Sequence, residues 1–133
     1  MNIKEVLENN PELKPDLFIR GFLITDKQLA TDAFPFYSNW ITEKHGKYYF
    51  MAHFLTGMHI IEKHGSIFFL MGHAYDPFAM EWKEENILSR IADVAGTEEY
   101  FERINDLTGV FVFGDVINGV IRYLVDPSGM QSA

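Results

Sequence analysis

Apolar side chains fill the middle of the chain in runs that are typical of β-strands. The runs are short, rich in aromatic and β-branched residues, and separated by turn-forming residues. They predict strands at Leu17–Thr25, Phe36–Lys44, Lys47–Leu55, Thr56–Lys63 and Ser66–Ala74. A strand with one solvated face alternates apolar and polar residues, but the last of these runs is almost continuously apolar. We therefore expect Ser66–Ala74 to be covered on both faces.

Helical spacing occurs in three segments. Ile3–Glu8 predicts a short first helix that ends before Pro11. After the acidic Glu84 and Glu85, an amphipathic stripe predicts a second helix that ends near Gly96, with the inward residues Ile87, Leu88, Ile91, Val94 and Ala95. Thr97 is expected to cap a third helix, whose inward residues are Tyr100, Phe101, Ile104 and Leu107.

The last part of the chain predicts a β-hairpin. Asn118-Gly119 is a preferred type I′ turn pair, and it lies between the apolar segments Val110–Ile117 and Val120–Val125. Together, the strands and helices predict an α+β fold with stacked, mainly antiparallel sheets and helices outside. We expect residues 1–16 to form an N-terminal extension and residues 17–133 to form a single domain.

Composition and charge exclude several classes of function. The 133 residues carry a net charge of −8, which argues against binding to a nucleic-acid backbone or to an anionic membrane. The chain contains no cysteine, so disulfides, cysteine zinc sites and thiol nucleophiles are excluded. The sequence contains no membrane-spanning apolar run and no signal-peptide pattern, so a cytoplasmic location is expected. No cofactor is expected.

The five histidines give no metal-binding pattern along the sequence. The tetrapeptide Glu-Lys-His-Gly occurs at 43–46 and again at 62–65, where His-Gly suits a tight hairpin turn. His53, His59 and His73 fall on predicted strands without a matching carboxylate pattern. We therefore expect turn formation rather than metal ligation from the two His-Gly pairs, and no zinc site from His53, His59 and His73.

Four segments follow one another in the order of motifs found in a known family. They are Gly72-His73-Ala74-Tyr75-Asp76, Lys83-Glu84-Glu85-Asn86-Ile87-Leu88, Ile104-Asn105-Asp106-Leu107-Thr108-Gly109-Val110-Phe111-Val112 and Tyr123-Leu124-Val125-Asp126-Pro127-Ser128-Gly129-Met130. In this order the sequence resembles the glutaminase (class II glutamine amidotransferase) domain of the asparagine synthetase family. The resemblance implies the four-layer αββα sandwich of the N-terminal-nucleophile hydrolases, in a truncated form.

Family members hydrolyse glutamine with an N-terminal cysteine, and the resemblance implies that this chemistry is lost here. Arg20 stands where the family has its cysteine, and Met71 stands where the family has an oxyanion-binding asparagine beside Gly72. His73 and Asp76 complete the remnant of the pocket, and Glu84 corresponds to the residue that binds the glutamine amino group.

The leading hypothesis is a catalytically inactive glutaminase-like domain that has a structural or interaction role. Its expected partners are an ATP-pyrophosphatase (synthetase) domain in a longer protein and a second copy of the chain. One alternative is an active amidohydrolase with a non-cysteine nucleophile, using His73, Tyr75 and Asp76, or Thr25 exposed by cleavage. The other is an aromatic-lined module that binds sugars or other small ligands.

Overall fold

A computed structural model describes residues 2–125 and shows a mixed α+β protein with antiparallel sheets. The chain divides into two compact units, Met1–Thr56 and Gly57–Ala133. The boundary expected between residues 16 and 17 is not the boundary between these units, and the single domain over 17–133 stays a prediction. Residues 126–130, which end the fourth motif, lie outside the described part of the chain.

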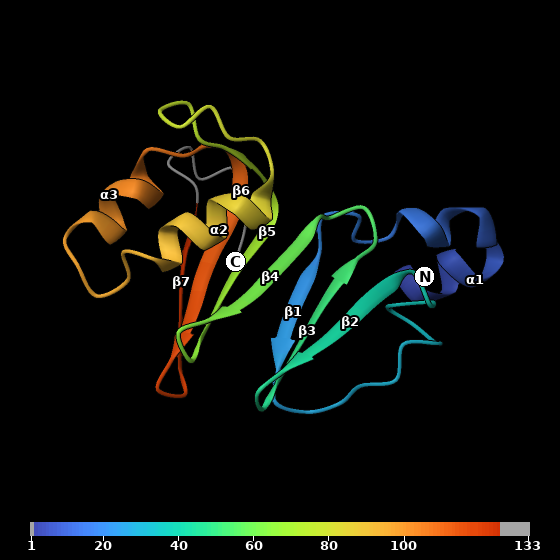
Figure 1. The fold of residues 1–133 in the computed structure, drawn as a ribbon. Coiled ribbons are helices and arrows are strands. Elements are labelled where there is room, and N and C mark those ends of the chain that lie inside the picture. The colour runs from blue at the N-terminus through green and yellow to red at the C-terminus, as the bar shows by residue number, and fades with distance from the viewer. Residues whose placement is uncertain (1, 126–133) are drawn as a thin grey trace. The chain divides into compact units, whose positions relative to one another are not determined.

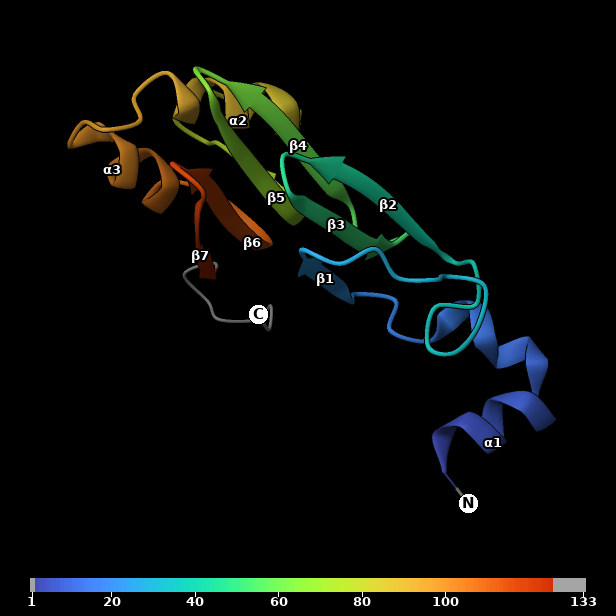
Figure 2. The same ribbon diagram turned by 90° about the horizontal axis from the view of Figure 1, so that it is seen from below.

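The first unit contains two short helices and a three-stranded sheet. Its elements are α1 (Ile3–Asn9), the 3₁₀ helix η1 (Pro11–Asp16), β1 (Phe22–Thr25), β2 (Trp40–His45) and β3 (Tyr48–His53). β3 lies between β1 and β2 and is antiparallel to both. The two helices lie at one end of this sheet (Figure 2). α1, expected from the sequence, begins where the Asn2 side chain accepts a hydrogen bond from the Glu5 N–H, 2.9 Å away.

The prediction of a strand over Leu17–Thr25 is wrong for its first five residues, 17–21, because β1 begins at Phe22. Local hydrogen bonds replace a strand ladder there, because the Gly21 N–H donates to the Phe18 carbonyl at 2.7 Å. The Thr56 hydroxyl also lies within hydrogen-bond distance of the Ile19 and Gly21 carbonyls, at 3.1 and 3.0 Å. An apolar run alone did not reveal this turn, because its polar partner comes from 35 residues further along the chain.

The second unit has a four-stranded sheet with two helices on one face (Figure 1). Its elements are β4 (Met58–Lys63), β5 (Ser66–Tyr75), α2 (Glu84–Ala92), α3 (Glu99–Asn105), β6 (Thr108–Ile117) and β7 (Val120–Val125). The strand order is β4-β5-β6-β7, and each neighbouring pair is antiparallel.

The two central strands, β5 and β6, are buried on both faces along most of their length. On the helix-covered face, the core cluster joins Phe68, Leu70, Ala74, Phe111 and Phe113 of the sheet to apolar side chains of α2 and α3. On the other face, Phe69, Met71 and Val112 are fully buried as well. The expectation for Ser66–Ala74 is thus confirmed, and His73 is its one exposed side chain.

The tight turns follow the expected chemistry, with one difference between the two Glu-Lys-His-Gly copies. His64 and Gly65 both have positive φ, as in a type I′ turn, and so do Asn118 and Gly119. In the first copy, His45 is still part of β2 and pairs with Tyr48, so the turn consists of Gly46 and Lys47. The same four residues therefore place histidine in the turn once and in a strand once.

Two predictions for the third helix are wrong: that Thr97 caps its start, and that Phe101 faces inward. The Thr97 hydroxyl donates to the Val94 carbonyl at 2.7 Å, which leaves Glu98 at the start of α3 without a side-chain cap. Phe101 is exposed, whereas Tyr100, Ile104 and Leu107 are buried as expected. α3 thus turns a narrower apolar stripe toward the sheet than the sequence indicated.

A buried carboxylate joins α3 to the last hairpin. Asp115 of β6 is 2% exposed and accepts a hydrogen bond from the Tyr100 hydroxyl. Arg122 of β7 donates to both Asp115 oxygens, from Nε at 3.0 Å and from Nη2 at 2.7 Å. Burial and the neighbouring Asp115 raise the pKa of Tyr100, and the hydrogen bond to Asp115 raises the pKa of Arg122.

We expect Asp115→Asn to lower the free energy of unfolding by roughly 2–3 kcal/mol, because it removes a buried charge that holds two partners. The matched control is Asp93→Asn, which breaks the 2.6 Å Lys63–Asp93 ion pair at an exposed position. Urea unfolding followed by circular dichroism measures both variants. Equal losses in the two variants would contradict the role assigned to Asp115.

Candidate functional site

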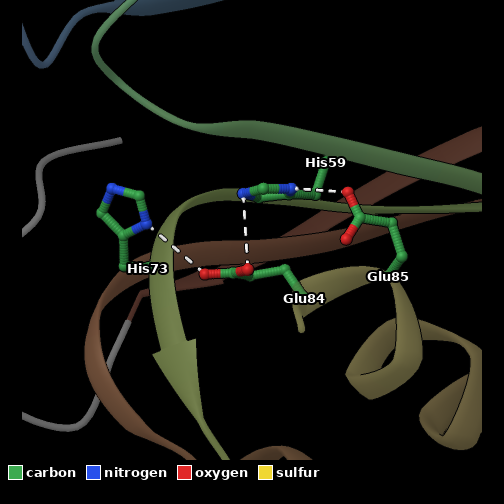
Figure 3. A network of polar contacts seen from close by, with 4 residues as sticks. All are labelled: His59, His73, Glu84 and Glu85. Carbon is green, nitrogen blue, oxygen red and sulfur yellow. Dashed lines mark hydrogen bonds and ion pairs between the residues drawn. The ribbon is translucent and has the colours of Figure 1, made fainter. Parts of the chain in front are cut away.

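Two histidines and two glutamates of the second unit form a polar network, the His–Glu cluster (Figure 3). It consists of His59 on β4, His73 on β5, and Glu84 and Glu85 at the start of α2. His59, His73 and Glu84 each offer one potential ligand atom, and these three atoms lie within 4.8 Å of one another. The cluster is thus a small site built from three elements.

Strand register and helix packing fix the position of His59. It lies two residues before Ile61 on β4, so both side chains face the same side of the sheet. Ile61 packs against the core cluster beneath the helices, and His59 therefore faces the first turn of α2. There its Nδ1 lies 3.0 Å from the Glu85 carboxylate, while its Nε2 lies 3.9 Å from the nearest oxygen of Glu84.

The hydrogen bond to Glu85 decides which nitrogen of His59 carries a proton. An ionised carboxylate only accepts hydrogen bonds, so Nδ1 is the donor and Nε2 of the neutral ring keeps its lone pair. The same hydrogen bond is the largest cause that lowers the pKa of Glu85. Nε2 is buried and has no hydrogen-bond partner among the described residues.

His73 reaches the cluster from a part of β5 that β4 does not cover. The β4–β5 ladder ends at the pair Met58–Met71, two residues before His73. The His73 side chain is 73% exposed, and its Nδ1 lies 3.4 Å from the Glu84 carboxylate. Glu84 is only 15% exposed and lies between the two rings (Figure 3). Its place in the first turn of α2 also favours a negative charge.

Among the described residues of the second unit that were proposed from the sequence, the structure brings His73 and Glu84 together. Met71 is fully buried and lies opposite Met58 on β4, so its side chain is part of the core. Arg20 belongs to the first unit. Asp76 accepts hydrogen bonds from the backbone N–H groups of Phe78 and Ala79, at 3.0 and 3.1 Å, and so stabilises a turn.

The three residues of the alternative hydrolase contact different partners. His73 contacts Glu84, whereas Asp76 contacts the turn that follows it. The Tyr75 ring lies against Trp82, with 4.4 Å between the ring centres. These contacts form no relay from a nucleophile to a base.

Sequence reasoning missed His59 and Glu85 as site residues. His59 and His73 are 14 residues apart, and no local spacing rule relates them to a helix that begins at Glu84. The available signal was the pair of acidic residues at the start of a helix that packs on histidine-bearing strands. The antiparallel register and the packing of α2 on β4 bring these side chains together, and neither can be deduced from local sequence.

Comparison of the chain with protein-family models, with curated proteins and with solved structures finds no match. In the described part of the chain, no helix combines the length and apolar character needed to cross a membrane.

Gly72 precedes His73 and is held where β5 and β6 approach closely. It has a φ of +108°, and a Cβ at this position would lie 2.3 Å from the Val110 carbonyl oxygen. Gly109 on β6 shows the reciprocal approach, because its Cβ would lie 2.2 Å from the His73 carbonyl oxygen. Both glycines are thus required by their backbone conformation and by the neighbouring strand.

We expect Gly72→Ala to lower the free energy of unfolding by more than about 3 kcal/mol, because it combines left-handed strain with a backbone clash. Gly96→Ala is the matched control, since Gly96 also has a positive φ but faces open space. The control should lose only about 1–2 kcal/mol. Denaturant unfolding of both variants measures the difference, and similar losses would show that the close approach does not matter.

Proposed function

We propose that this chain is a glutaminase-like domain without catalytic activity, acting as a structural or interaction domain of an asparagine synthetase-related protein. The observation that carries the proposal is the loss of reactive groups from motifs that are otherwise retained. The chain contains no cysteine, and Arg20 stands at the position of the nucleophile. Met71, at the position of the oxyanion-binding asparagine, has a thioether that donates no hydrogen bond and lies fully buried.

The position of the two glycine-containing motifs supports the proposal. Gly72 belongs to the first motif and Gly109 to the third, and these motifs lie on the paired strands β5 and β6. Each glycine lies against the backbone of the other strand. These two glycines of the resembling motifs therefore share a structural role, which does not depend on catalysis.

The architecture also supports the layered sandwich as a proposal. The second unit supplies one layer of helices on one face of a four-stranded sheet, and its central strands are buried on both faces. The first unit supplies a second antiparallel sheet, of three strands. These parts are the components that a truncated αββα sandwich needs.

Exposed apolar side chains in the second unit support a role in association. β7 lies at one end of the strand order, and Val120, Tyr123, Leu124 and Val125 along it are exposed. The loop before α2 exposes Phe78, Met80 and Trp82, each by more than 70%. Apolar groups in such numbers are typical of surfaces that contact another protein. We propose a second copy of this chain, and a synthetase domain, as the partners.

We expect the purified chain to release no ammonia from glutamine above the uncatalysed rate. The reason is that the chain offers neither a thiolate nor the oxyanion donor that lowers the barrier to amide hydrolysis. A coupled glutamate dehydrogenase assay measures the ammonia. Turnover that His73→Ala or Asp76→Ala abolishes would contradict the proposal and would favour the hydrolase alternative.

We expect light scattering at tens of micromolar to give the mass of a dimer. Tyr123→Lys should shift the mass toward the monomer, because a lysine on an edge strand opposes pairing with another strand. The control is Ile3→Lys, which places the same charge at a comparably exposed apolar position on α1. A monomeric unmodified chain, or equal effects of the two variants, would remove β7 as the dimer interface.

A further inference from the structure

We propose that the His–Glu cluster binds one divalent transition-metal ion of the zinc class. Its ligands are Nε2 of His59, the imidazole of His73 and the carboxylate of Glu84. Two imidazoles and one carboxylate form a donor set that suits zinc and its neighbours in the first transition row. The inference is independent of the proposed glutaminase ancestry, because it rests only on the side chains of the cluster.

The potential ligand atoms of the cluster are close enough together for small side-chain movements to form a tetrahedral site. With bonds of about 2.0–2.1 Å to nitrogen and oxygen, neighbouring ligand atoms of a tetrahedral zinc ion lie about 3.3 Å apart. His73 Nδ1 lies 3.4 Å from Oε1 of Glu84, and His59 Nε2 lies 3.9 Å from Oε2 of the same carboxylate. The widest separation in the set is no more than 4.8 Å, and the exposed side chain of His73 has room to shorten it.

The unpartnered nitrogen of His59 gives an independent reason for a metal. Burial of a polar atom without a hydrogen bond costs about 1–3 kcal/mol. The nearest carboxylate oxygen is 3.9 Å away, too far for a hydrogen bond, and a carboxylate has no proton to donate. A cation between Nε2 and Glu84 satisfies both groups at once, because each offers a lone pair.

Glu85 completes the arrangement as a positioning residue. Histidines that bind metals usually donate their other N–H to a carboxylate or a carbonyl, which fixes the ring and its tautomer. The 3.0 Å contact from His59 Nδ1 to Glu85 has this form and directs the free lone pair of Nε2 toward Glu84. Glu85 therefore acts on the metal through His59 and does not touch it.

Three protein ligands leave a coordination position for water or for a donor atom of a bound molecule. The exposure of His73 places this position on the solvent side of the cluster. Glu84 and Glu85 together also offset the two positive charges of the ion. The site thus lies at the surface, with two mostly buried ligands, His59 and Glu84, and one exposed ligand, His73.

The test is titration of the metal-free chain with Zn²⁺ by isothermal calorimetry at neutral pH, with the visible absorption of bound Co²⁺ as a second readout. We expect one ion per chain, Co²⁺ bands of tetrahedral type, and a rise in melting temperature with Zn²⁺ that EDTA reverses. Absence of saturable binding, or a stoichiometry other than one, would overturn the proposal.

His73→Ala is the decisive variant, because its exposed side chain can be removed without disturbing the fold. It should weaken Zn²⁺ binding at least tenfold, as should His59→Ala and Glu84→Gln. Glu85→Gln should weaken binding by about tenfold or more while it keeps the stoichiometry. Circular dichroism of each metal-free variant confirms that it is folded.

His64→Ala is the matched control, because His64 also lies beside a carboxylate, 3.3 Å from Asp93, but has no second histidine near it. It should bind Zn²⁺ like the unmodified chain. An equal loss of binding in the His64 and His73 variants would assign the metal to unspecific surface histidines and end the proposal. The outcome of the glutamine assay does not change the outcome of the Zn²⁺ titration. The proposed function and the proposed metal site are therefore tested independently.

Discussion

The pairing of β5 with β6 is the interaction on which the second unit depends. Nine residue pairs connect the two strands, from Ile67–Val116 to Tyr75–Thr108. Gly72 and Gly109 allow the two backbones to approach more closely than any side chain would permit. Because apolar side chains leave these strands on both faces, one face holds α2 and α3 while the other is buried as well. A defect in this pairing would therefore disturb the core on both sides at once.

The His–Glu cluster is a consequence of the same pairing. Buried side chains of β5 and β6 hold α2 against the sheet, and the start of α2 carries Glu84 and Glu85. The register of β4 on β5 then places His59 beneath that helix end, and the end of the ladder leaves His73 open to solvent. No residue of the cluster needs an unusual conformation, since the packing of the apolar core already brings the four side chains together.

Elements specified by neighbouring residues were predictable from the sequence. The Asn118-Gly119 hairpin, α1 and the doubly covered β5 each have a local cause, namely a turn pair, a cap or an unbroken apolar run. The turn at Leu17–Gly21 was not predictable, because Thr56 comes from far along the chain. The cluster was half predictable: His73 and Glu84 came from motif order, but His59 needed the strand register. Short-range chemistry thus predicted the elements, and long-range packing decided the site.

The proposed loss of catalysis and the proposed metal site are compatible, although His73 and Glu84 belong both to the expected pocket remnant and to the His–Glu cluster. Under the proposed glutaminase ancestry, the oxyanion-binding group would lie beside Gly72, where Met71 is part of the core. The His–Glu cluster lies at the exposed end of β5 and at the first turn of α2, where the side chains of His73 and Glu85 are exposed. The side chains of His59 and Glu84 are mostly buried, and Nε2 of His59 has no hydrogen-bond partner among the described residues. Burial of Nε2 without a hydrogen bond from the described residues costs free energy when no metal ion is bound. A metal ion that binds the Nε2 lone pair offsets this cost. The same ion would also be bound by the carboxylate of Glu84.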